Sequence, residues 1–394
     1  MTVYSHSRLS TFEQCRLKYK YHYIDKIETD IDQTIECFMG ELVHKTLEKL
    51  YIDKKFNKKN SLKDLIDYYN RMWKKNFNEK ILIVRKDYNE ENFRKIGEKC
   101  IKHYFEKHRP FEEATTIATE KKIEIDLDDT GNYVLQGYID RLDCKGNTYE
   151  IHDYKTSSHL PLQKYADQDR QLALYSIAVN ENYKDAKDIK LIWHYLVFKK
   201  DIVSTRSKKE IEKLKKQTIN LIEEIESNNE YYPKTSTLCR WCEYQRICPN
   251  WKHLYETKNL PKNKFLNEPA VKLANEYVKI NNKKKKLEKK LEKLKKAIFD
   301  YCYKNDVERI FGTDHRLTCK TYENYKKKKK KDPLRNELIK VLKKLGKYEE
   351  ASQIDIFKLS RILKQEKWPK EIQKVLLNFT EDETVQRIYV GKKY

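Results

Sequence analysis

Glycine and proline are scarce in this chain, with 8 residues of each among 394. Folds built from many short strands need tight turns at short intervals, and glycine and proline are the usual residues in those turns. The scarcity therefore argues against a repetitive β architecture and favours long helices joined by short loops. At about 100–200 residues per domain, the length predicts two or three domains.

Long apolar runs are also lacking. No run in the sequence approaches the roughly 18–20 apolar residues that span a bilayer. The first ten residues, which include His6 and Arg8, contain no apolar stretch typical of a secretory signal. We therefore expect a cytoplasmic protein with no membrane partner. A hydrophobic content of 39% with 12% aromatic residues is sufficient for a packed core.

Acidic residues are too few to balance the basic ones, and the excess of positive charge is distributed unevenly along the chain. The chain has 84 Lys and Arg against 61 Asp and Glu, a net charge of +23. Residues 258–394 contain 38 basic and 19 acidic residues, so this third carries +19 of that charge. The sequence therefore predicts a nearly neutral domain over 1–257 and a basic C-terminal extension over 258–394 that faces a polyanion.

The spacing of apolar residues predicts a mixed α/β core in the first domain. Helical periodicity comes first, strand alternation begins near residue 114, and helices and a further strand follow. The expected helices are 7–26, 38–51, 163–180 and 207–226, and the expected strands are 114–127, 133–144, 148–156 and 190–198. In the extension, a heptad stripe interrupted by Lys284 predicts a long helix over about 270–304, followed by a hairpin at about 310–322 and a helical tail.

Two carboxylates and a lysine are expected on one face of adjacent strands. Asp153 and Lys155 are two residues apart, so on a strand their side chains share a face, and Asp140 on the preceding strand reaches the same face. Neighbouring carboxylates repel each other unless a cation lies between them. Oxygen ligands suit Mg²⁺ or Mn²⁺, and a lysine can orient an attacking water. An isolated Asp-x-Lys, by contrast, more often forms an ordinary ion pair.

Three of the nine cysteines are clustered. Cys239, Cys242 and Cys248 lie within ten residues, which predicts a metal or iron–sulfur site that needs a fourth ligand. The scattered cysteines are most simply small buried hydrophobes.

Five motifs occur in an order that resembles the PD-(D/E)XK nuclease superfamily, specifically its RecB-like branch. The resemblance covers about residues 1–255. The motifs are the opening segment 4–19, Gly40-x-x-x-His44, Gly137-x-x-Asp140-Arg141-x-Asp143, Asp153-Tyr154-Lys155 and Gln171-x-x-x-Tyr175.

The resemblance implies a restriction-endonuclease-like core, a mixed central sheet flanked by helices, with a site for Mg²⁺ or Mn²⁺. The implied metal ligands are His44, Asp140, Asp153 and the backbone carbonyl of Tyr154. Lys155 would orient the attacking water, Gln171 would position Lys155 or a DNA phosphate, and Tyr175 would pack beside the site.

Without the motifs, His44 would be interpreted as a packed core histidine, and Gln171 with Tyr175 as a polar stripe beside a core tyrosine. We expect Glu120 to be a solvated charge rather than part of the metal shell, and Asp143 to be an arginine partner or a structural acid rather than a ligand.

The resemblance also supplies a fourth cysteine. Members of the branch that carry an iron–sulfur cluster use one cysteine before the core and three after it, which here implies Cys15 with Cys239, Cys242 and Cys248. Four thiolates satisfy a 4Fe-4S cluster, which would join the two ends of the domain. A four-cysteine zinc site is the alternative.

Two lysine runs in the extension are candidates for phosphate contacts. They comprise Lys283, Lys284, Lys285, Lys286, Lys326, Lys327, Lys328, Lys329, Lys330 and Lys331. Tyr322 and Tyr325 beside the second run offer faces for stacking single-stranded bases. The alternative is that both runs are only solvated charge.

The resemblance therefore implies a metal-dependent DNA nuclease, an exonuclease on single-stranded or frayed DNA ends in recombination, repair or replication. The sequence contains no phosphate-binding P-loop, so a helicase or a recombination protein would be a separate partner. Two other interpretations remain. A CRISPR-associated spacer-processing nuclease shares the core and the cluster, although the basic extension departs from that group. A non-catalytic DNA-binding module would not need Asp140, Asp153 and Lys155 together.

Overall fold

The computed structural model describes residues 3–128, 130–320, 333–344, 348–351 and 370–371. The chain divides into two compact units, Met1–Leu260 and Pro261–Tyr394. Each unit is described here by itself.

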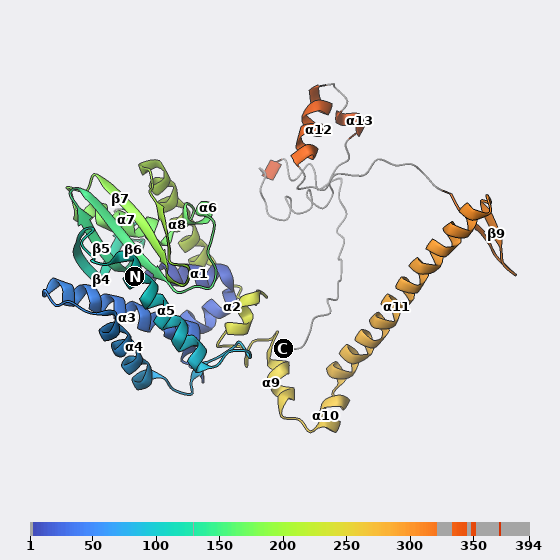
Figure 1. Ribbon diagram of the computed structural model, residues 1–394, viewed down its shortest axis with the longest axis horizontal. Helices are drawn as coiled ribbons and strands as arrows, with labels where there is room; N and C mark the ends of the chain where they lie inside the picture. Colours follow the sequence, from blue (N-terminus) through green and yellow to red (C-terminus); the bar gives the residue numbers. More distant parts are fainter. Residues whose placement is uncertain (1–2, 129, 321–332, 345–347, 352–369, 372–394) are drawn as a thin grey trace. The chain divides into compact units, whose positions relative to one another are not determined.

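The first unit is built on a mixed six-stranded sheet (Figure 1). Strand β5 pairs with β1 in parallel and with β4 and β6 in antiparallel fashion, β6 pairs with β7 in parallel, and β7 pairs with β8 in antiparallel fashion. This arrangement confirms the predicted mixed α/β fold. The strands are β1 Tyr4–Ser5, β4 Thr115–Asp126, β5 Val134–Lys145, β6 Thr148–Lys155, β7 Asp188–Tyr195 and β8 Lys200–Ser204, and a separate short pair consists of β2 Gln33–Thr34 and β3 Ile81–Leu82.

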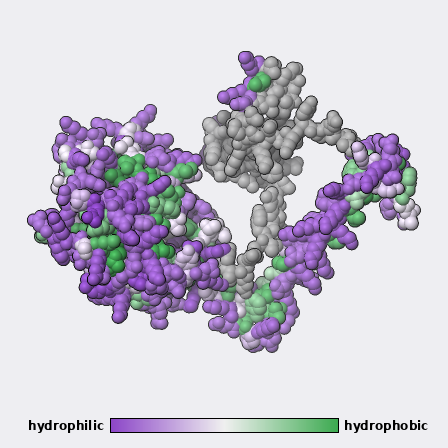
Figure 2. All heavy atoms as spheres, in the orientation of Figure 1, coloured by the Kyte–Doolittle hydropathy of each residue, from purple (hydrophilic) through white to green (hydrophobic). Residues whose placement is uncertain are grey.

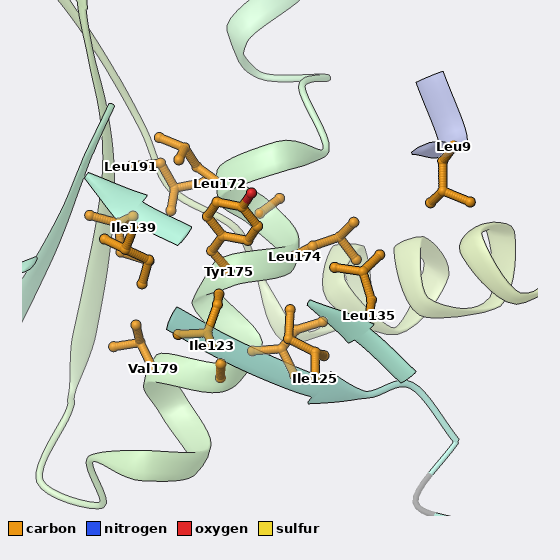
Figure 3. Packing of buried hydrophobic residues seen from close by; sticks show 14 of the residues in the cluster. Leu9, Ile123, Ile125, Leu135, Ile139, Leu172, Leu174, Tyr175, Val179 and Leu191 are labelled. Carbon is orange, nitrogen blue, oxygen red and sulfur yellow. The ribbon is translucent and has the colours of Figure 1, made fainter. Parts of the chain in front are cut away.

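Helices cover both faces of the sheet, and each face has its own apolar cluster (Figure 1). One cluster joins the sheet to α3 Ile35–Lys55, α4 Leu62–Asn76 and α5 Glu90–His108. The other joins it to α1 His6–Gln14, α6 Gln163–Ala166, α7 Gln171–Asn182 and α8 Lys208–Ser227. Figure 3 shows Tyr175 and Val179 of α7 packed against Ile123 and Ile125 of β4. The sheet is therefore buried on both sides, and polar side chains between its layers need specific partners.

Local sequence fixes where several of these helices begin. Helices α4, α5 and α8 each start with a capping box, in which the side chains of the cap residue and of the third helical residue bond to each other's backbone N–H groups. The pairs are Ser61 with Asp64, Asn89 with Asn92, and Ser207 with Glu210.

The expected continuous helix over 7–26 is interrupted at Cys15. Cys15 has extended backbone angles, φ −161° and ψ 109°, between α1 and the short α2 Arg16–Tyr19, and a π-helical turn Lys20–Ile24 follows. The prediction of one helix was therefore wrong. The break is stabilised locally, because the Cys15 N–H still donates to the Thr11 carbonyl.

The helix expected over 163–180 is likewise two helices. Arg206 donates to the carbonyl oxygens of Ala166 and Asp169, which satisfies backbone acceptors at the end of α6. The Asp169 carboxylate accepts from the Gln171 N–H at 2.9 Å, which starts α7 at that residue. The expected strand 190–198 also ends earlier, at Tyr195, and continues as a 3₁₀ turn, Leu196–Phe198.

The remaining elements include the end of the first unit and the helices of the second. The first unit ends with a 3₁₀ helix Thr237–Trp241 and α9 Lys252–Lys258, and the second contains α10 Lys262–Asn267, α11 Pro269–Lys304, the hairpin β9 Arg309–Phe311 with β10 Arg316–Thr318, α12 Pro333–Lys344 and α13 Tyr348–Ala351. The face of α11 visible in Figure 2 is mainly hydrophilic. No helix among the described residues is long and apolar enough to cross a membrane.

Candidate active site

The pairing of β5 with β6 brings Asp140 and Asp153 together. Arg141 pairs with His152 in the ladder, so the residues on either side of that pair, Asp140 and Asp153, lie opposite each other. The Tyr154 N–H donates to Asp140 Oδ2 at 2.8 Å. Burial raises the pKa of Asp140, but His44 and the Tyr154 N–H outweigh burial and hold that pKa below its usual value. Asp140 is therefore an ionised carboxylate at the end of the ladder.

His44 approaches the same point from α3. Its Nε2 atom lies 2.6 Å from the carbonyl oxygen of Tyr154, and its Nδ1 atom lies 3.4 Å from Asp140 Oδ2. Burial lowers the pKa of His44, but the charge of Asp140 and the hydrogen bond to it outweigh burial and raise the pKa to about 9. A positive imidazolium thus lies between two oxygen acceptors. The donor set is one that a divalent cation could also occupy.

Gly40 permits the close approach of α3 that places His44. A Cβ atom at Gly40 would lie 3.1 Å from the Thr156 Oγ1 atom, closer than ordinary van der Waals contact. A larger side chain there would require either the Thr156 side chain or the helix to shift. In the Gly-x-x-x-His motif, the glycine therefore leaves room for the helix beside the strand, and the histidine places its imidazole at the end of that strand.

Lys155, Asp153 and Gln171 form a triangle of polar contacts. Lys155 Nζ lies 2.6 Å from Asp153 Oδ2. The Gln171 amide bridges the pair, because its Nε2 donates to Asp153 Oδ1 and its Oε1 accepts from Lys155 Nζ, both at 3.2 Å. Burial, opposed by Lys155 and reinforced by Asp140, raises the pKa of Asp153 to about 6. The start of α7 at Gln171 thus fixes the lysine.

Tyr175 packs beneath this triangle. It is 5% exposed, and its ring lies so close to Gly137 that a Cβ atom there would be 2.4 Å from the ring. Figure 3 shows the ring among Ile123, Ile139 and Leu172. Gly137 therefore allows the tyrosine to approach β5, and the tyrosine supports the strand that carries Asp140.

Glu120 lies closer to the metal-ligand candidates than its sequence context suggested. It is an exposed residue of β4, and its φ of +45° is unusual for a residue with a side chain. Its carboxylate and the ligand atoms of His44 and Asp140 all lie within 4.8 Å of one another. Burial and, next, the charge of Asp140 raise the pKa of Glu120 to about 6. Strand alternation alone could not reveal this backbone turn.

The sequence model of the PD-(D/E)XK nuclease superfamily matches residues 3–249, which is more than half of the chain. The chain belongs to the PD-(D/E)XK nuclease superfamily.

Two solved structures share a weaker likeness with it. A crystal structure of a candidate exonuclease from Eubacterium rectale is 12% identical, with a TM-score of 0.37, and the match covers 64% of this chain and 87% of that one. The crystal structure of the protein SSO0001 is 18% identical, with a TM-score of 0.23, over 41% of this chain and 79% of that one. No curated protein matches the chain. The family assignment therefore rests on the sequence model.

Asp143 of this PD-(D/E)XK protein is an arginine partner, as expected. Arg141 Nε lies 3.1 Å from Asp143 Oδ2, and both side chains are buried. The Arg141 guanidinium also lies 4.1 Å from the centre of the Tyr51 ring on α3. The pair therefore ties β5 to a flanking helix, on the opposite side of the strand from Asp140.

The four cysteines proposed as cluster ligands line one cavity of about 60 Å³. They are Cys15, Cys239, Cys242 and Cys248. Backbone N–H groups approach two of the sulfur atoms, Lys234 N at 3.5 Å from Cys15 Sγ and Ser236 N at 3.3 Å from Cys239 Sγ. Burial raises the pKa of Cys242 to about 11. The fold thus places residue 15 beside residues 239–248, and the extended conformation at Cys15 contributes to this placement.

The structure describes only one of the two lysine runs. Lys283, Lys284, Lys285 and Lys286 lie on the exposed surface of α11, and Lys284 lies 3.8 Å from Glu288 one turn later. The run Lys326–Lys331, together with Tyr322 and Tyr325, lies outside the described residues.

Proposed function

We propose that this chain is a metal-dependent DNA nuclease that hydrolyses phosphodiester bonds. The observation that carries the proposal is the convergence of two polar groups at one end of the β5–β6 ladder. His44, Asp140 and the Tyr154 carbonyl form the first group, and Asp153, Lys155 and Gln171 form the second. Family membership supports the reaction class.

The first group fits a divalent cation. Asp140 and the Tyr154 carbonyl offer oxygen atoms, and His44 offers a nitrogen once its proton leaves. Asp153 completes the ligand set that we propose for Mg²⁺ or Mn²⁺. When bound, the cation would neutralise charge on the phosphate and favour ionisation of water. A cation there would also relieve the repulsion between Asp140 and Asp153, which adds to burial in raising the pKa of Asp153.

Lys155 is positioned to hold the attacking water. Its ammonium is 2.6 Å from Asp153 and is held from a second side by Gln171, so its direction is restricted. An ammonium group can donate to a water or to a phosphate oxygen while it remains bonded to both side chains, because it has three N–H donors. Gln171 acts through Lys155 and Asp153 as a positioning residue.

We further propose an exonuclease that acts on single-stranded or frayed DNA ends, as in the RecB-like branch, with strand separation supplied by another protein. The basic extension supports a polyanionic ligand, because Lys283–Lys286 lie exposed on α11. These lysines would neutralise phosphates without reading sequence.

The cysteine cavity is proposed to hold a 4Fe-4S cluster. Four sulfur ligands around one cavity, with N–H groups directed at two of them, support this assignment. The cluster would join the start of the nuclease unit to its end. Iron and zinc analysis of anaerobically purified protein distinguishes the cluster from the zinc alternative.

The function is tested with end-labelled DNA. Single-stranded, blunt and frayed duplexes are incubated with Mg²⁺ or Mn²⁺, and products are resolved by size over time. We expect shortening of single-stranded and frayed ends that stops when EDTA is added. Binding without cleavage under every metal condition would instead identify a DNA-binding module on the same fold.

A further inference from the structure

A second group of metal-ligand side chains lies away from the proposed nuclease site. His194 on β7 and Asp201 on β8 are paired across the ladder, and His108 is the last residue of α5. His194 Nδ1 lies 2.8 Å from Asp201 Oδ1, and His108 Nε2 lies 3.6 Å from Asp201 Oδ2. The three ligand atoms lie within 4.8 Å of one another, and the three residues share the lining of a small cavity of about 10 Å³.

This group is on the sheet face opposite to Asp153. Side chains alternate along β6, so His152 and Tyr154 point away from the face that carries Asp153 and Lys155. The rings of His152 and His194 are nearly parallel, with an angle of 7° between their planes and centres 5.2 Å apart. The two candidate sites are therefore separated by the sheet itself.

The contacts of His194 call for a donor at both ring nitrogens, which a neutral ring cannot supply without a cation. Arg141 has only donors, so its NH2 group donates to His152 Nδ1 at 2.9 Å, which makes that nitrogen an acceptor. His194 Nε2 lies 2.9 Å from the same acceptor and must therefore donate to it. In a neutral His194 ring, Nδ1 is then a lone pair that faces the carboxylate of Asp201 at 2.8 Å. Two acceptors at that distance repel unless a proton or a metal ion lies between them.

His108 presents a second lone pair to the same place. Its Nδ1 lies 3.4 Å from Glu113 Oε2, and because a carboxylate only accepts, Nδ1 is the donor. In the neutral ring Nε2 is therefore unprotonated. That nitrogen is buried, in a residue only 6% exposed, and makes no hydrogen bond with the part of the chain that the structure describes. A buried polar atom without a partner is costly and calls for an explanation.

Both histidines thus follow the pattern of metal-bound imidazoles. Each uses one ring nitrogen to donate to a neighbouring acceptor, which orients the ring, and turns the other nitrogen toward a shared point. His152 is the acceptor for His194, and Glu113 is the acceptor for His108. Asp201 provides the third ligand and a negative charge.

We propose that His108 Nε2, His194 Nδ1 and a carboxylate oxygen of Asp201 bind a zinc-class transition-metal ion, independently of the proposed nuclease function. Two imidazoles and one carboxylate form a donor set typical of Zn²⁺. Mg²⁺ prefers oxygen ligands, so the two sites select different cations. The bound ion ties the end of α5 to β7 and β8 and holds the layer of side chains behind β6.

Lys107 competes with this metal ion. Its Nζ lies 2.8 Å from Asp201 Oδ2 and supplies positive charge to the carboxylate without a metal. The side chain is 31% exposed, so it can turn into solvent when a cation binds. Replacing Lys107 with a neutral residue of similar length is therefore expected to strengthen metal binding. An ion-pair network with no metal function predicts no such gain.

The test is a Zn²⁺ titration of the full chain after removal of loosely held metal. Calorimetry measures the affinity and the number of ions bound, and thermal unfolding measures the melting temperature. Saturating Mg²⁺ occupies the nuclease site, and iron is measured in the same samples to account for the cysteines. We expect one Zn²⁺ per chain at this site, with affinity at least tenfold weaker in His108→Gln and in Asp201→Asn. Lys107→Met should bind more tightly. His103→Gln, which lines the same cavity without belonging to the ligand set, should bind as the parent does.

Zn²⁺ should also raise the melting temperature of the parent and of His103→Gln, but not of His108→Gln. If His108→Gln does not fold, Asp201→Asn and Lys107→Met decide the result. The absence of Zn²⁺ binding by the parent, or equal binding by the parent and the ligand variants, overturns the proposal. Zinc held at the cysteines gives that second result, because the His108 and Asp201 substitutions would leave it unchanged.

Discussion

The Nε2 atom of His44 lies 2.6 Å from the main-chain carbonyl oxygen of Tyr154. A side chain on α3 thereby contacts the backbone of β6 between Asp153 and Lys155, the two residues that we propose for catalysis. The contact depends on how closely α3 approaches the strand, and the missing side chain at Gly40 leaves room for that approach. The packing of α3 and the proposed metal site are thus linked through one glycine.

Gly40→Val should weaken Mn²⁺ binding about tenfold or more, because the larger side chain displaces α3 and with it His44. Glycine is unfavourable inside a helix by about 1 kcal/mol, so the substitution raises helix propensity while it disturbs position. Calorimetric titration with Mn²⁺ measures the affinity, and Glu41→Ala on the exposed side of α3 is the control. Parent-like affinity in a folded Gly40→Val protein would show that the close approach does not matter.

Gln171→Leu removes both hydrogen bonds that hold Lys155 and Asp153 together. We expect the single-turnover cleavage rate to fall about 10–100-fold, while affinity for Mn²⁺ changes less than threefold. Gln168→Leu alters an exposed glutamine in the turn before α7 and should cleave at the parent rate. An equal loss in both variants would assign the effect to general destabilisation of that turn.

Cys15→Ser should lower the iron content and the melting temperature together, because Cys15 is the proposed ligand that would join the start of the unit to residues 239–248. Cys37→Ser replaces an exposed cysteine on α3 and should retain both. Metal analysis and thermal unfolding are measured on the same preparations. Full iron content in Cys15→Ser would remove that residue from the ligand set.

Replacing Lys283, Lys284, Lys285 and Lys286 with glutamine should flatten the salt dependence of single-stranded DNA binding. Each lost phosphate contact reduces the log–log slope by about 0.7, so four contacts correspond to about 3 units. The matched control removes four exposed lysines from α8, Lys208, Lys209, Lys213 and Lys216. Equal slopes in the parent and the α11 variant would mean that this run is only solvated.

Sequence patterns predicted β4, β5, β6 and β7 because these strands alternate or are apolar and lie between recognisable turns, whereas the short strands β1 and β8 were not predicted. The facing of Asp140 and Asp153 also followed from residue spacing, since side chains on a strand repeat every two residues. The features that the sequence did not predict concern backbone geometry. The extended conformation of Cys15 and the positive φ of Glu120 are single-residue departures from regular geometry, and hydrophobic periodicity does not predict such departures.

The sequence did not predict the group formed by His108, His194 and Asp201, for a related reason. Its members come from one helix end and two strands, and 93 residues separate the farthest two. Each residue taken singly is an ordinary polar side chain. Only the sheet register, which pairs His194 with Asp201, brings the ligands together.

The most direct test of the nuclease assignment is the rate of DNA cleavage by Lys155→Ala under single-turnover conditions with saturating Mg²⁺. Lys164→Ala, an exposed lysine on α6, is the matched control, and DNA affinity is measured for both variants. The account predicts that Lys155→Ala binds DNA as the parent does but cleaves it about 10²–10⁴-fold more slowly, the usual cost of losing a group that positions or transfers a proton. Cleavage by Lys155→Ala at the rates of the parent and of Lys164→Ala would contradict it.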